Sequence, residues 1–259
     1  MKAHEIDYKL YGDDMQFVEI ELDPRESVMA EAGAMMMMED GIEMETIFGD
    51  GTEQKGLFGK LMGAGKRLVT GESLFMTVFT NTSYEQRRVS FAASYPGKII
   101  PVDLQQYDQK IICQKDAFLC AAKGVSVGVE FSKKLGRGFF GGEGFIMQKL
   151  EGDGLTFIHA GGTIYKRELQ VGEKLRIDTG CLVAMTQDVH YDIQFVGNVK
   201  TALFGGEGLF FATLEGPGTV WIQSLTLSRL AQRIAGAGAV KSEEGSVLGG
   251  IGRLFDGNE

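Results

Sequence analysis

The chain has 259 residues, of which 44% are hydrophobic and 24% charged, so it has enough apolar side chains for a folded core and is not intrinsically disordered. Its formal net charge of −9 opposes non-specific binding to nucleic acids, which depends on cationic side chains that meet phosphates. The 37 glycines are about twice the usual share. They follow no Gly-X-Y period, which excludes a collagen helix.

The beginning of the chain, Met1–Phe17, is polar, carries charges of both signs and lacks the apolar core of a secretory signal. No stretch approaches the roughly 18 apolar residues of a membrane-spanning helix. The three cysteines, Cys113, Cys120 and Cys181, are odd in number and lack the spacing of a zinc site. These features predict a cytoplasmic protein without disulfide bonds and without a bound cofactor.

The first unit of the chain, about residues 15–98, contains apolar and polar residues in alternation, which is typical of half-buried strands. Met35–Met38 is a run of four methionines, and we interpret it as a core strand filled with adaptable side chains. A copper site is a poor alternative, because neighbouring residues of a strand point to opposite faces. The Gly-rich segment Gly49–Lys66 is predicted to be an exposed loop.

The next two units, about residues 99–163 and 164–224, repeat each other at an offset of 64 residues. Between Phe140–Ala160 and Phe204–Ser224, ten of the 21 positions are identical. The first unit matches the second less closely, at an offset of 83 residues before its inserted loop. The sequence therefore predicts three copies of one unit, made of strands that are separated by Gly, Asp and Asn turns.

We predict an all-β fold in which three β-sandwich-like units surround a pseudo-threefold axis and form a single domain over residues 1–235. One short helix is predicted over Ser224–Ala235, where Leu227 and Ile234 share one face. This helix is expected to dock on the β core, and a membrane-surface or partner-binding helix is the alternative. Residues 236–259 form a Gly-rich tail that is mobile or ordered by a neighbouring subunit.

A glutamate follows a glycine at the same place in every unit, as Glu72, Glu143 and Glu207. We favour the interpretation that these carboxylates accept backbone hydrogen bonds at a turn, or meet Lys or Arg side chains between units. The alternative is that they converge on the predicted axis as ligands of a metal ion, which would relieve their mutual repulsion. They are weak metal candidates, and no catalytic or cofactor-binding residue is predicted.

The histidines and cysteines form no recognisable catalytic pattern. His4, His159 and His190 occupy no recurring place in the units, so we expect structural or surface roles for them. An enzyme site that uses His159 or His190 is the alternative. The cysteines align with small or apolar residues of the other units and are expected to be buried core thiols.

Two Gly-rich segments resemble phosphate-binding loops only in part. Gly136–Gly141 fits the pattern G-x-G-x-x-G, but it runs into a predicted strand where the motif requires a helix. Gly59–Arg67 lacks the glycine spacing and the final Ser or Thr of a P-loop. The basic side chains in and near these segments are interpreted as solvated loop residues. They are Lys60, Lys66, Arg67, Lys133, Lys134 and Arg137.

Several long segments within about residues 15–235 resemble one known family. They are Tyr95–Ile99, Phe140–Gly162, Leu175–Ala184, Tyr191–Gly197, Thr201–Gly208 and Trp221–Ser224. The chain is similar to a prokaryotic family of unknown function whose eukaryotic relatives are the altered-inheritance-of-mitochondria (mitochondrial biogenesis) proteins. The resemblance implies an all-β fold like that of the tryptophan RNA-binding attenuation protein, repeated three times, and no established catalytic residues. The inner-membrane location of the eukaryotic members is not expected here, because the chain shows no transit segment.

We therefore expect a non-catalytic scaffold or binding protein that forms homo-oligomers and is not an enzyme. The C-terminal segment is the candidate contact for a protein partner or a membrane surface. The alternative function is a small-ligand or RNA-binding module that uses crevices between the units, although the acidic balance disfavours nucleic acid.

Overall fold

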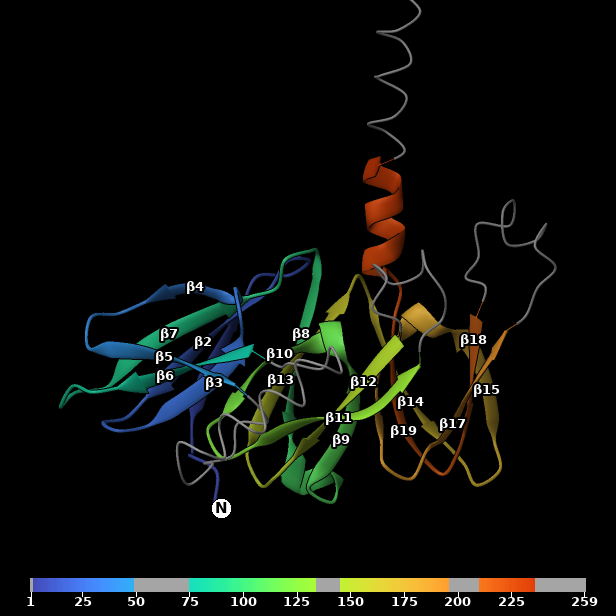
Figure 1. Ribbon diagram of the computed structural model, residues 1–259, viewed down its shortest axis with the longest axis horizontal. Helices are drawn as coiled ribbons and strands as arrows, with labels where there is room; N and C mark the ends of the chain where they lie inside the picture. Colours follow the sequence, from blue (N-terminus) through green and yellow to red (C-terminus); the bar gives the residue numbers. More distant parts are fainter. Residues whose placement is uncertain (1, 49–74, 134–144, 196–209, 236–259) are drawn as a thin grey trace, which may run out of the picture.

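A computed structural model describes residues 2–48, 75–133, 145–195 and 210–235 (Figure 1). The described residues contain 19 β-strands, three 3-10 turns and one short α-helix, and every pairing between the strands is antiparallel. The all-β fold class is confirmed. The alternation that predicted the strands has its physical counterpart in β2 (Phe17–Leu22), where Val18, Ile20 and Leu22 are fully buried and the residues between them are partly exposed.

After β1 (Asp7–Tyr11), the strands fall into three consecutive segments of six. The first segment contains β2, β3 (Ser27–Glu31), β4 (Met35–Met38), β5 (Ile42–Phe48), β6 (Phe75–Asn81) and β7 (Arg87–Ala92). The second contains β8 (Gly97–Asp103), β9 (Lys110–Gln114), β10 (Phe118–Ala122), β11 (Ser126–Lys133), β12 (Phe145–Glu151) and β13 (Leu155–Gly161). The third contains β14 (Ile164–Leu169), β15 (Lys174–Asp178), β16 (Leu182–Thr186), β17 (His190–Phe195), β18 (Phe210–Glu215) and β19 (Gly218–Gln223).

Each segment is divided between two sheets, and neighbouring segments share a sheet. Sheet 1 has the order β1-β2-β7-β4 and sheet 2 the order β5-β6-β3-β10-β13-β8. Sheet 3 follows with β11-β12-β9-β16-β19-β14, and sheet 4 with β15-β18-β17. Sheets 2 and 3 are therefore built alike: the fourth, fifth and second strands of one segment join the third, sixth and first strands of the next.

The two places where segments join, which we call the inner junctions, also share their register. In the junction of β3 with β10, Ala30 lies opposite Cys120. In the junction of β9 with β16, Cys113 lies opposite Ala184. A register shift at the same place in β4, β10 and β16 fixes which of their residues correspond. The corresponding positions used below are Met38, Ala121 and Met185.

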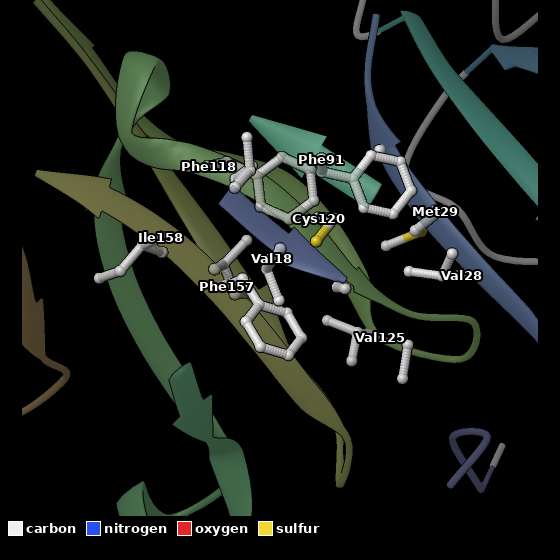
Figure 2. Packing of buried hydrophobic residues seen from close by; sticks show 14 of the residues in the cluster. Val18, Val28, Met29, Phe91, Phe118, Cys120, Val125, Phe157 and Ile158 are labelled. Carbon is white, nitrogen blue, oxygen red and sulfur yellow. The ribbon is translucent and has the colours of Figure 1, made fainter. Parts of the chain in front are cut away.

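The hydrophobic core runs through the stack of sheets in two clusters. The larger cluster joins residues of sheets 1, 2 and 3, and the smaller one lies between sheets 3 and 4. Figure 2 shows Val18 and Phe91 of sheet 1 close to Cys120 and Phe157 of sheet 2. Cys120 and the other β10 side chains are buried on both faces of their sheet, because sheet 2 is covered on both sides.

The structure does not show the expected pseudo-threefold closure. Such an axis would bring the third segment against the first, whereas β4 and β15 lie at opposite ends of the molecule (Figure 1). Both are edge strands, β4 of sheet 1 and β15 of sheet 4. Two inner junctions are present within the described residues, and the two strands that a third would need form no strand pair with each other. We call β4 and β15 the open edges.

The methionine run differs from its predicted burial for the same reason. Met35–Met38 does form a strand, but its four side chains are 36–47% exposed. The corresponding residues of β10 and β16 are almost all buried, because those strands have neighbours on both sides. The expected core strand is an edge strand, since burial here depends on a neighbour that the described part of the chain does not supply.

The C-terminal helix spans residues 227–235. Thr226 caps its N-terminus, because the Thr226 hydroxyl accepts a hydrogen bond from the Arg229 backbone N–H at 3.1 Å. The helix extends away from the sheets rather than lying on them (Figure 1). Ile234 on its apolar face is 65% exposed. The expected docking on the β core is therefore not observed, because only the first turn of the helix reaches the sheets. The expected tail, residues 236–259, lies outside the described residues.

Candidate functional site

Several residues that the sequence singles out lie outside the described residues. They include the three glutamates Glu72, Glu143 and Glu207, both Gly-rich segments, and all of the basic loop residues except Lys133. The metal-site hypothesis for the glutamates therefore stays a prediction. Within the described ranges, no group of three or more His, Cys, Asp or Glu side chains is arranged to hold a metal ion.

The histidines and cysteines lie in different surroundings. The His4 Nδ1 accepts a hydrogen bond from the Ser27 backbone at 2.9 Å, and burial lowers the pKa of His4. His190 is exposed. Cys113 and Cys120 are fully buried, and burial raises the pKa of both thiols, so neither is a reactive thiolate. Cys181, which was also expected in the core, is only partly buried.

A cavity of about 300 Å³ lies in the crevice between the first two segments. The first segment contributes the β3–β4 turn with Glu31 and the turn between β7 and β8 with Tyr95. The second segment contributes Asp116, the apolar start of β10 and His159 of β13. Leu227, the first residue of the C-terminal helix, lines the same cavity. We call this cavity the first crevice.

His159 is the buried polar group of the first crevice. The residue is 3% exposed, and neither ring nitrogen has a hydrogen-bond partner. The ring stands edge-on to Tyr95, with centroids 4.5 Å apart and planes at 88°. Burial lowers the pKa of His159 to about 4, and a polar contact with the Tyr95 main chain, whose geometry falls short of a hydrogen bond, offsets this only in part. The imidazole is therefore neutral near pH 7, with one nitrogen that donates and one that accepts.

Gln223, the corresponding residue of the third segment, has hydrogen-bond partners for both polar atoms of its side chain. His159 lies opposite Ile99 in β8, and Gln223 lies opposite Ile164 in β14. The Gln223 Oε1 accepts a hydrogen bond from the Gly161 backbone at 2.7 Å, and its Nε2 donates to the Gly180 carbonyl at 2.8 Å. The amide bridges two main-chain groups there, whereas the imidazole in the first crevice makes no such bridge.

The first crevice is also acidic. Burial, and secondarily the charge of Asp116, raise the pKa of Glu31 to about 7, while Lys115 acts in the opposite direction. The same environment raises the pKa of Tyr95 to about 12, mainly through burial. Glu31 and Asp116 therefore line the same partly buried space and influence each other through their charges.

Sequence reasoning named His159 but missed Glu31 and Asp116. Their signal was the alignment itself: Glu31, Gln114 and Asp178 hold the same last position of β3, β9 and β15. Of these three polar residues, Glu31 lines the first crevice. The Glu31 carboxyl was overlooked because its partner Asp116 belongs to a different unit, 85 residues further along the chain.

A second hollow, of about 510 Å³, lies between the second and third segments. His190 and Asp192 of β17 line it together with Phe131 of β11. The Tyr191 hydroxyl beside it is buried without a hydrogen-bond partner, and burial raises the pKa of that phenol. Among the described residues that line this hollow beside His190, none is a cysteine or a serine.

The chain belongs to a recognised protein family. The model of the family "Mitochondrial biogenesis AIM24" matches residues 8–225, so the chain is a member of this family. The resemblance noted in the sequence is thereby confirmed. The expected likeness to the tryptophan RNA-binding attenuation protein stays a prediction.

Two relatives from Streptococcus pyogenes support this assignment. An uncharacterized protein of the serotype M6 strain is 32% identical over 223 residues, which cover 84% of this chain and 85% of the relative. The crystal structure of the protein SPYM3_0169 matches with a TM-score of 0.69 at 26% identity, over 89% of this chain and 99% of that one. Neither relative carries a named activity. Among the described residues, no helix has the length and apolar character needed to cross a membrane.

Proposed function

We propose that this protein is a non-catalytic scaffold whose copies assemble head to tail, with β4 of one copy pairing with β15 of the next. The observation that carries the proposal is the pair of open edges, because each lacks the neighbour that the corresponding strands have at the inner junctions. The proposal treats the three segments as copies of one unit, which the shared strand order and registers support.

The inner junctions predict the register between two copies. β15 pairs with β18 as β9 pairs with β12, so Ile177 corresponds to Cys113. β4 pairs with β7 as β16 pairs with β19, so Met37 corresponds to Ala184. Transferring the inner registers to the open edges gives the pairs Met37 with Ile177, Met38 with Arg176, and Glu39 with Leu175.

The two open edges are complementary in polarity and charge. β4 presents four exposed methionines, which adapt to a new partner, and β15 presents the half-buried Leu175 and Ile177. Continued by one residue, the same register places Lys174 opposite Asp40, which is an oppositely charged pair. An exposed strand edge that carries no proline or inward-pointing charge is a template for pairing with another chain.

The predicted contact is heterologous, because it joins two different edges. Such contacts close into a ring when the rotation between copies permits, and otherwise continue as a filament. Joining sheet 4 of one copy to sheet 1 of the next rebuilds the sheet that the inner junctions already contain. Assembly would therefore bury the methionines of β4 without any change of fold.

The register can be tested by a disulfide between copies. We expect Met38→Cys combined with Arg176→Cys, in a Cys181→Ser background, to give covalent dimers and larger species on mild oxidation. Directly opposed residues in an antiparallel pair have Cα atoms about 4.5–5.5 Å apart, which suits a disulfide. Non-reducing electrophoresis and native mass spectrometry provide the measurement.

The matched control pairs Met38→Cys with Leu175→Cys, since Leu175 points to the opposite face of its strand. Equal cross-linking in both double variants, or none in either, would contradict the register. Peroxide oxidation offers a second measurement without substitutions. Met38, exposed in a dilute monomer, should oxidise much faster than the buried Met185, and assembly at higher concentration should remove this difference.

The exposed C-terminal helix supports a second candidate role as a membrane-surface contact. Leu227 and Ile234 are exposed on its apolar face, and the exposed Arg233 is suited to anionic headgroups. Co-sedimentation of the full chain with phosphatidylglycerol vesicles tests this role. Binding that Ile234→Asp abolishes would support it, and equal absence of both proteins from the pellet would refute it.

A further inference from the structure

The strand β4 differs in composition from the other edge strands. Each of the four described sheets has two edge strands, and seven of these eight strands contain at least one charged residue. Charges of this kind keep a sheet edge from pairing with another chain. β4 contains four methionines and neither a charged residue nor a proline. Among the described edge strands, β4 is therefore the one whose side chains oppose pairing least.

Burial at an inner junction does not require methionine. The places that correspond to Met35–Met38 hold Phe118–Ala121 in β10 and Leu182–Met185 in β16, with one methionine among these eight residues. All eight are buried. The methionines of β4 thus bring a property that the junction itself does not use. That property is the thioether, an apolar group that a mild oxidant converts reversibly into a polar one.

The thioethers of β4 are accessible in a single copy. The side chains of Met35–Met38 are 36–47% exposed, whereas Met29, Met147 and Met185 in inner strands are at most 3% exposed. Pairing with β15 of another copy would bury the β4 side chains as β10 and β16 are buried at the inner junctions. An oxidant therefore reaches these sulfur atoms in the unassembled copy, and oxidation competes with assembly.

We propose that Met35–Met38 form a modification site through which peroxide prevents head-to-tail assembly, an inference that rests on the assembly proposed above. The sulfur lone pair attacks one oxygen of hydrogen peroxide, and the S–O bond forms as the O–O bond breaks. A proton passes to the departing oxygen, which leaves as water. Sulfur loses two electrons and the peroxide gains them. The product is methionine sulfoxide, which a sulfoxide reductase returns to methionine with a dithiol as the reductant.

The sulfoxide oxygen is a polar acceptor that an assembled edge would enclose. At both inner junctions the strands that correspond to β4 are buried on both faces, so a sulfoxide on either face of β4 would lose its contact with water. In the proposed register Met37 lies opposite Ile177, which offers no hydrogen-bond donor in its side chain. Each enclosed sulfoxide should therefore weaken the association of two copies by roughly tenfold or more.

Oxidation of the dilute monomer tests the proposal. The Cys181→Ser protein, which lacks the partly buried thiol, is treated with hydrogen peroxide, freed of peroxide by catalase and then concentrated. Native mass spectrometry and light scattering measure assembly. We expect the oxidised protein to remain monomeric at roughly ten times the concentration at which the untreated protein assembles. Sulfoxide reductases A and B with dithiothreitol should restore assembly, and dithiothreitol alone should not.

Two variants locate the effect on β4. The four-leucine variant combines Met35→Leu, Met36→Leu, Met37→Leu and Met38→Leu, and it should still assemble but no longer respond to peroxide. Met15→Leu is the matched control, because Met15 is 62% exposed but lies outside the open edge, so this variant should respond as the wild type does. Peptide mapping gives the same information without substitutions: loss of assembly should follow oxidation of the β4 peptide and not that of Met15.

The outcomes separate this inference from the proposed assembly. Failure of the untreated protein to assemble would overturn the assembly, and this inference with it. Assembly that peroxide leaves unchanged would overturn this inference alone. The same conclusion would follow if peroxide prevented assembly equally in the four-leucine variant, or if loss of assembly followed the oxidation of Met15.

Discussion

The corner between β3 and β4 and the corner between β15 and β16 occupy the same place in their segments, but their burial is reversed. β3 is buried and β4 exposed in the first segment, whereas β15 is partly exposed and β16 buried in the third. In each corner the buried strand is the one that has neighbours on both sides. Position in the stack of sheets, rather than hydrophobicity alone, decides which apolar strand reaches water.

The largest expected effect compares two methionines at corresponding positions. Met185→Lys places a charge in a site that is 3% exposed, and should lower the free energy of unfolding by about 3 kcal/mol or more. Met38→Lys, on the open edge, should change the stability of the monomer by less than about 0.5 kcal/mol and still prevent assembly. Chemical denaturation measures the change in stability, and light scattering of the native protein measures assembly. Similar destabilisation by the two substitutions would break the comparison.

An intermediate effect is expected at the last residue of β3. The pKa of Glu31 is raised to about 7 from an ordinary value of 4.5, so the folded state holds its proton while the unfolded chain loses it. The free energy of unfolding of the wild type therefore decreases as the pH rises from 4.5 to about 7, and this loss of stability persists at higher pH. Glu31→Gln should be more stable than the wild type by about 1–3 kcal/mol above pH 7, and equally stable below pH 4.5. Thermal unfolding of both proteins across this pH range tests whether the substitution raises the melting temperature above pH 7.

The smallest effect is expected at the corresponding residue of β15. Asp178 accepts a hydrogen bond from the Gly180 backbone at 2.8 Å and pairs with Arg229 of the C-terminal helix at 3.0 Å. Arg229 is partly exposed, so Arg229→Ala should cost only about 0.5–1 kcal/mol. Urea denaturation at low and high salt measures this loss of stability. A loss that is the same at both salt concentrations would show that packing rather than charge is responsible.

Much of the architecture could be predicted from the sequence. Strand alternation, the offset of 64 residues and the glycine turns indicated an all-β chain of similar units, because these patterns reflect local backbone geometry. Gly97 shows how local the requirement is: a Cβ at this residue would lie 2.1 Å from the Ala160 carbonyl oxygen. Glycine is therefore required where two strands approach this closely.

The candidate site was only partly predictable. His159 was visible as a residue, but its unpaired nitrogens depend on Gly97 and Tyr95 around it and on the absence of the bridge that Gln223 makes. The meeting of Glu31 with Asp116 required two units to pack together. No local pattern encodes such a contact, because the two residues come from different segments.

The sequence by itself determined that this protein is an all-β chain, since strand periodicity and glycine placement depend on neighbouring residues, and it predicted that the strands form recurring units. Only the tertiary structure decided which strands are inner and which are edges. The run Met35–Met38 is as apolar as any core strand, yet it is exposed because no strand within the described ranges pairs with its free edge. Burial depends on partners far along the chain, or on another copy, and no local pattern specifies them.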